Sequence, residues 1–124
     1  MTADVTLTVT VAGGKFLIDG VSQATVDVSK CITYRFDQSD SSNSGHPLRL
    51  SLTSNGTHAG GSEYTERVTI SGTPGSFGAY TEIEISAKRD IYYYCSNHSN
   101  MGGVVRFNFQ NLLNYPSKFL SNSE

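Results

Sequence analysis

Apolar and polar residues alternate along much of this chain. Every second residue from position 5 to 11 is apolar, and threonines fill the positions between them. Successive side chains of a strand point to opposite faces of a sheet, so this alternation predicts a strand with one buried face. The same period of two recurs in shorter apolar sets: Phe16 and Ile18; Ala24, Val26 and Val28; Ile32, Tyr34 and Phe36; Leu48, Leu50 and Leu52; Val68 and Ile70; Ile83 and Ile85; Ile91, Tyr93 and Cys95; Val105, Phe107 and Phe109.

Glycine-rich and polar segments separate these predicted strands. Asp19-Gly20 is a strong hairpin signal, because glycine tolerates the positive φ of a tight turn. Residues 37–45 and 55–64 are polar or rich in glycine and show no periodicity, so we expect loops there, and a turn at 72–78. Threonine, serine, glycine and asparagine are abundant, which favours strands and turns over helices. The sequence therefore predicts an all-β sandwich of about seven to eight strands.

Length and charge narrow the classes of protein further. A chain of 124 residues fits one domain, which we place at residues 1–109, with a C-terminal tail at 110–124 that is expected to pack on its own domain or on a partner. The net charge is −2 and the basic residues are scattered, so nucleic acid is not an expected partner. Neither an export signal nor a membrane span is evident, and we expect no membrane association.

One short segment concentrates residues that bind metals. Cys95, His98 and Met101 lie on a loop that follows a predicted strand. His46 shares the inward face of the strand that contains Leu48, and so is expected at the core end of that strand. A thiolate, two imidazoles and a thioether form the ligand set that suits copper in both of its oxidation states. The four residues have the types and spacing of a type 1 copper site.

At these residues the chain resembles the cupredoxin family, over roughly positions 5 to 109. In that family a first histidine precedes a strand, and a Cys-x-x-His-x-x-Met loop closes the site. The resemblance implies a Greek-key sandwich that binds one copper ion through His46, Cys95, His98 and Met101. It also implies that the ring of His98 is the route by which an electron enters or leaves.

A narrower resemblance links the chain to cupredoxin-like modules of marine phage virion proteins, especially those of cyanophages. It is carried by the strings GKFLIDG, YRFDQSD, GHPLRLS, GTPGS and YYYCSNHSNMGG. Two positions depart from that pattern, namely Asn100, where glycine is expected, and Cys31, in a turn that is usually polar or glycine. A disulfide between Cys31 and Cys95 would consume the thiolate, but the two cysteines fall in different parts of the strand scheme, and we expect none.

Other candidate sites have simpler interpretations. His58 lies in a glycine-rich segment and is expected at the surface rather than at the metal. Asp37 and Asp40 fit turn formation better than calcium binding. No oxyanion donor or orienting acid can be assigned beside Cys95, so we do not expect an enzyme. Two interpretations remain open for the tyrosines 92 and 94, which are expected either to pack against a second sheet or to form an exposed contact patch.

Two functions follow from these observations. The first is a structural or interaction subunit of a phage virion, either a capsid decoration or a tail component, whose partners are other virion proteins. The missing export signal favours it, because freely diffusing bacterial cupredoxins work outside the cytoplasm. The second is a blue-copper electron-transfer protein with a redox partner docking near His98, in the periplasm or outside the cell. The ligand set favours the second function.

Overall fold

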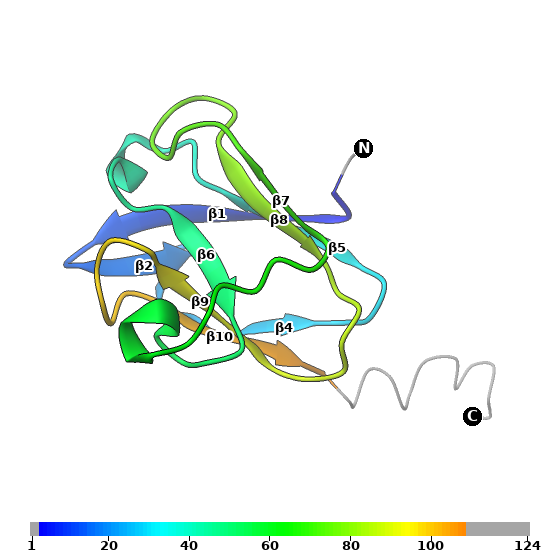
Figure 1. Cartoon of the computed structure of the whole chain (residues 1–124). Helices are drawn as coiled ribbons and strands as arrows, with labels where there is room; N and C mark the ends of the chain where they lie inside the picture. The colour runs from blue at the N-terminus through cyan, green and yellow to red at the C-terminus, as the bar shows by residue number, and fades with distance from the viewer. Residues whose placement is uncertain (1–2, 109–124) are drawn as a thin grey trace.

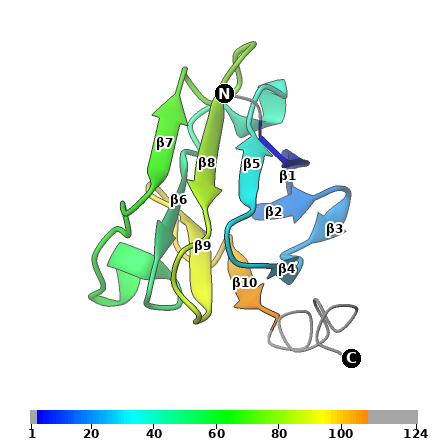
Figure 2. The same ribbon diagram turned by 90° about the vertical axis from the view of Figure 1, so that its right-hand side faces the viewer.

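The alternating segments form two β-sheets that lie face to face. The computed structural model describes residues 3–108, in which ten strands and two short 3-10 helices are present. Figures 1 and 2 show the two sheets as separate layers. Both sheets are mixed, because each contains one parallel pair among antiparallel ones. The fold is therefore all-β, as the alternation predicts.

The first sheet has six strands, and its central pair is parallel. β1 runs beside β5 with Val5 opposite Tyr34, and the remaining pairs are antiparallel. In spatial order the strands are β3 (Val21–Ser22), β2 (Lys15–Ile18), β1 (Val5–Ala12), β5 (Thr33–Asp37), β8 (Tyr80–Glu84) and β7 (Val68–Ser71).

The second sheet has four strands. In spatial order they are β4 (Val26–Val28), β10 (Gly103–Phe107), β9 (Ile91–Cys95) and β6 (Leu48–Ser51). β4 and β10 are parallel, and the other pairs are antiparallel. β6 is an edge strand that pairs with β9, with Leu48 opposite Cys95. This register decides where the candidate metal ligands meet.

The core lies between the two sheets. Tyr93 is at its centre, with its ring 6.3 Å from that of Phe16 and 5.9 Å from that of Phe36, measured between centroids. The Tyr93 hydroxyl donates a hydrogen bond to the carbonyl oxygen of Ala24 at 2.7 Å. Burial of such aromatic side chains is the main source of stability in a domain of this size. The other large buried side chains include Val9, Ile18, Val28, Leu48, Leu50, Ile83, Ile85, Ile91, Met101, Val105 and Phe107.

The described residues contain more strands than the expected seven to eight. The Asp19-Gly20 hairpin is confirmed, but its second strand is only Val21–Ser22. Gln23 then adopts a left-handed φ of 48°, and Val26–Val28 joins the other sheet beside β10. One predicted strand is thus divided into two short ones because the chain crosses between the sheets.

Two predicted loops each contain a short 3-10 helix, and one apolar residue that is expected on the buried face is exposed. Residues 37–45 include the 3-10 helix η1 (Ser41–Asn43), and residues 55–64 include η2 (Gly56–Ala59). Leu52 was expected on the buried face, but β6 ends at Ser51 and Leu52 is 40% exposed. Phe109 and the predicted tail at 110–124 lie outside the described residues. Among positions 3–108, no helix is long and apolar enough to cross a membrane.

Candidate metal centre

Cys95 is the last residue of β9, and its side chain is fully buried. Its neighbours on the same face, Ile91 and Tyr93, are also buried, which confirms the predicted alternation. The antiparallel register places Leu48 opposite Cys95, and the Ser96 N–H donates to the Pro47 carbonyl oxygen at 3.0 Å. The segment that precedes β6 therefore lies beside the end of β9.

His46 lies in that segment, one residue before Pro47. Its Nδ1 atom is 3.7 Å from the Sγ atom of Cys95, and its side chain is half-buried. Pro47 precedes the strand, where its missing N–H costs the ladder nothing. His46 thus reaches the core end of the strand, as predicted.

His98, in the loop that follows Cys95, approaches the same sulfur. Its Nδ1 atom is also 3.7 Å from Cys95 Sγ, and the rings of His46 and His98 have centroids 4.7 Å apart. The candidate ligand atoms of the three residues all lie within 4.8 Å of one another. His98 is exposed to solvent, whereas Cys95 is not. This cluster of two imidazoles and one thiol could hold a metal ion.

The separations in the cluster fit a bound first-row metal. Such a metal bonds a thiolate at about 2.3 Å and an imidazole nitrogen at about 2.0 Å. With bonds roughly 120° apart, as in a trigonal site, the sulfur and nitrogen are about 3.7 Å from each other. Both sulfur-to-nitrogen distances have this value. Each histidine is therefore separated from the sulfur as two ligands of one ion would be.

Met101 enters the core at the far end of the loop. Its side chain is 2% exposed, and its carbonyl oxygen accepts a hydrogen bond from the Phe16 N–H at 2.9 Å. A buried position agrees with either a packing role or a ligand role for the thioether.

The electrostatic environment favours neutral imidazole at His46. Burial lowers the pKa of His46, and the charge of His98 lowers it further. A metal ion binds the neutral form of imidazole, because the ring nitrogen must offer its lone pair. The surroundings of His46 thus favour the protonation state of this ring that binds metal.

The ligand loop is held by side chains from outside it. Asn100 donates its N–H to Asn55 Oδ1 at 2.8 Å, and its carbonyl oxygen accepts from Lys15 Nζ at 2.8 Å and from Gln23 Nε2 at 3.1 Å. Gln23 Nε2 also donates to the carbonyl oxygen of Gly102 at 2.8 Å. Lys15 and Gln23 fix the loop against the β2–β3 hairpin of the six-stranded sheet, and Asn55 fixes it against the start of η2.

His58 contacts the site in a way that the sequence did not indicate. It is exposed, as predicted, but its Nε2 atom lies 2.7 Å from the carbonyl oxygen of Cys95. A carbonyl oxygen only accepts, so Nε2 carries the hydrogen. The His58 ring also lies edge-on to Tyr94, with centroids 6.2 Å apart. Tyr94 is buried beneath η2, so it forms no exposed patch, but it packs against a 3-10 helix and not against a second sheet.

Cys31 takes no part in the cluster. It is free and exposed, whereas Cys95 is free and buried, so the expected absence of a disulfide between them is confirmed. Cys31 has a left-handed φ of 69° and donates its N–H to the carbonyl oxygen of Ile85 at 2.8 Å. The thiol of Cys95 therefore remains available to a metal.

Comparison of the chain with protein-family models and with curated proteins found no match. Fold and cluster together define a β-sandwich domain with a candidate metal site of one buried cysteine and two histidines, at the end where β9 stops and β6 begins.

Proposed function

We propose that this domain is cupredoxin-like and binds one copper ion through His46, Cys95 and His98, with Met101 as a weak fourth ligand. The observation that carries the proposal is the pair of equal distances, 3.7 Å, from Cys95 Sγ to the Nδ1 atoms of the two histidines. When bound, copper supplies one-electron redox chemistry.

The kinds of donor favour copper over other metals. Zinc sites of structural type use four strong ligands, and calcium or magnesium sites use oxygen. The cluster offers one cysteine sulfur and two imidazoles, and a buried thioether follows in the same loop. This is the His₂Cys set with a weak methionine that blue-copper sites use.

The exposure of the ligands supports a role in electron transfer. Cys95 is sealed from solvent, whereas the ring of His98 reaches the surface. A buried sulfur is protected from substrates and oxidants, which argues against a nucleophilic role. A redox partner would approach the site at His98.

A second candidate function is that of a structural subunit of a phage virion, and the two functions are compatible. The five sequence strings favour it, and so does the surface of the six-stranded sheet. Val21 on edge strand β3 is 58% exposed, Ile70 on edge strand β7 is 42% exposed, and Phe77 beyond β7 is fully exposed. Exposed apolar residues at unpaired sheet edges are suited to assembly with other chains.

Addition of Cu(II) to the reduced protein tests the copper site directly. We expect a strong visible absorption band, because a copper–thiolate bond gives a charge-transfer transition. Cys95→Ser should abolish the band, whereas Cys31→Ser, which removes the exposed cysteine, should leave it intact. Absence of the band in the folded wild-type protein would overturn the proposal. Incorporation of Cys95→Ser into particles as efficiently as wild type would show that assembly does not need the metal.

A further inference from the structure

Gln38 is a buried polar residue that lies directly after β5, in the sheet opposite to the ligand strand β6. Its side chain is 1% exposed. Its own main chain is fixed on both sides, because its N–H donates to the carbonyl oxygen of Ala79 at 2.9 Å and its carbonyl oxygen accepts from the Gly75 N–H at 2.8 Å. The backbone of Gln38 is therefore held in place at both its N–H and its carbonyl group.

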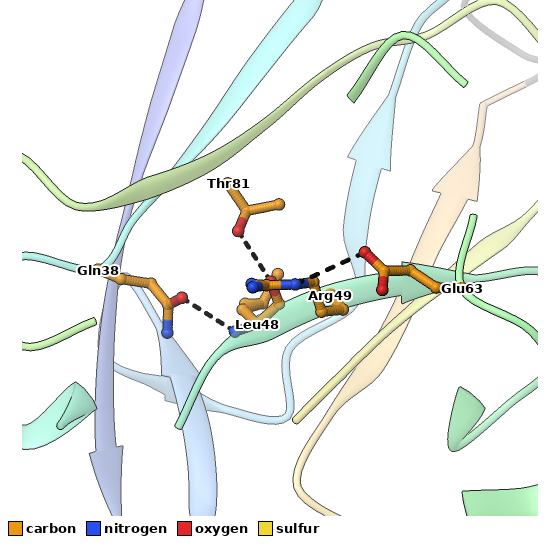
Figure 3. Close-up of polar contacts among 5 residues, drawn as sticks. All are labelled: Gln38, Leu48, Arg49, Glu63 and Thr81. Atoms are coloured by element: carbon orange, nitrogen blue, oxygen red, sulfur yellow. Dashed lines mark hydrogen bonds and ion pairs between the residues drawn. The ribbon is translucent and has the colours of Figure 1, made fainter. Parts of the chain in front are cut away.

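The amide group of Gln38 contacts the backbone on both sides of Pro47. Its Nε2 donates to the carbonyl oxygen of His46 at 2.7 Å, and its Oε1 accepts from the Leu48 N–H at 2.9 Å. Figure 3 shows the second of these bonds, with Gln38 and Glu63 on opposite sides of Leu48. Since a carbonyl only accepts and an N–H only donates, the amide has a single possible orientation.

Both N–H groups of this amide and its oxygen have hydrogen-bond partners. The second hydrogen of Gln38 Nε2 goes to Asn43 Oδ1 at 2.9 Å, and Asn43 Nδ2 donates to the carbonyl oxygen of Val9 at 2.8 Å. Asn43 is fully buried. The hydrogen bonds from Gln38 to the His46 segment are thus connected, through Asn43 of η1, to the central strand β1.

The backbone of the three-residue segment is fully paired as a result. The His46 N–H donates to the carbonyl oxygen of Asn43 at 2.8 Å, and the Pro47 carbonyl oxygen accepts from Ser96. The Leu48 carbonyl oxygen accepts from Thr81 Oγ1 at 2.8 Å, a bond also drawn in Figure 3. The two bonds to Gln38 account for the remaining groups, so the segment has little freedom to move.

We infer that Gln38 is a positioning residue that fixes His46 in its metal-binding orientation before any metal arrives, an inference that rests on the proposed metal site. Pro47 has no N–H to donate, and the ladder of β6 begins only after it, at Leu48. Gln38 holds this segment by bonding the residues before and after the proline. Partners outside the ligand set commonly orient metal ligands in this way.

The experiment compares Gln38→Met with Thr81→Val in the full chain. Gln38→Met keeps the length of the side chain but removes both bonds that flank Pro47. Thr81→Val removes a buried bond to Leu48 without touching His46, and is the matched control. In metal-free protein we expect the ring signals of His46 in NMR spectra to broaden or split in Gln38→Met, and to stay single in Thr81→Val.

Copper affinity provides the second measurement. Competition with a chelator for Cu(I) should show about a 10–100-fold loss for Gln38→Met, and no loss for Thr81→Val. If Gln38→Met fails to fold, Gln38→Glu at alkaline pH takes its place, because an ionised carboxylate keeps the acceptor for Leu48 but has no hydrogen to give His46.

Two outcomes would overturn the inference: His46 ring signals that match wild type in the Gln38 variant, or equal affinities in the two variants. A wild-type protein that binds no copper would overturn the proposed function alone, because the metal-free ring signals would still decide the role of Gln38.

Discussion

Asn100 and Cys31 both occupy left-handed backbone positions, with φ of 64° and 69°. Glycine adopts this conformation without cost, and asparagine tolerates it better than other residues do. Asn100 and Cys31 therefore each stand where the backbone conformation favours glycine. The side chain of Asn100 accepts a hydrogen bond from Asn55 Nδ2, which offsets part of the cost of the left-handed backbone.

Met101 offers a prediction about the proposed copper site. Met101→Leu keeps a buried side chain of similar volume but removes the sulfur. The visible band should persist, because it arises from Cys95, and the reduction potential should rise, because a weak donor to the more positive oxidised ion is lost. Voltammetry beside the absorption spectrum measures both. An unchanged potential would show that Met101 only packs in the core.

At the level of elements, η2 covers the outer face of β9 through a tight contact. A Cβ atom at Gly56 would lie 2.5 Å from the ring of Tyr94, and Gly56 also has a left-handed φ of 53°. The close approach of this backbone to the ring is what buries Tyr94. It also brings His58 to the carbonyl oxygen of Cys95.

Gly56→Ala should therefore be strongly destabilising. Overpacking costs about 1–3 kcal/mol, and the left-handed backbone adds about 1–2 kcal/mol. Gly60→Ala is the control, because Gly60 has a φ of +84° but no atom within 4 Å of its built Cβ. Urea unfolding of the two variants should show the larger loss at Gly56. Equal losses would mean that η2 moves aside and does not press on Tyr94.

The elements differ in how well the sequence predicts them. Strands such as β1 and β9 follow from alternation, since burial of one face imposes a period of two. The sequence predicts β4 as a strand but does not show which strand it pairs with, because three residues carry no information about a distant partner. That partner is β10, and the paired residues Asp27 and Arg106 are 79 positions apart. The prediction that Leu52 is buried is wrong for a related reason, since alternation does not show where a strand ends.

The candidate site was predictable to a similar degree. Residue type and spacing identified His46, Cys95 and His98, and the structure brings all three together. Gln38 and His58 left no such signal. Both bond to main-chain oxygens, of His46 and Cys95 respectively. Every residue has such an oxygen whatever its side chain, so the sequence gives no sign of these contacts. Supporting residues of this kind emerge only from the fold.

At the level of the whole molecule, both sheets contribute to the site. The ligands belong to segments that adjoin β6 and β9, whereas Gln38, Lys15 and Gln23 come from or adjoin strands of the opposite sheet. Figure 1 shows that β10 starts at the ligand loop and runs away from it, so the site occupies one end of the sandwich. A metal held there would join segments that are distant in sequence.

Copper should therefore stabilise the entire fold. A ligand that binds only the native state adds about 2.7 kcal/mol when its free concentration is about 100 times Kd. Calorimetry should show a higher Tm for wild type with Cu(I) than without it, and no increase for Cys95→Ser. The same increase in the variant would place the bound metal elsewhere in the molecule.

The anchoring of the ligand loop also bears on how such a protein evolves. Lys15 and Gln23 recognise the loop through the carbonyl oxygens of Asn100 and Gly102, atoms that every amino acid supplies. Mutations that alter outward side chains of the loop would leave these anchors in place. Mutations of these side chains could thus change which partner binds at the ligand loop, while the loop keeps its position on the sandwich.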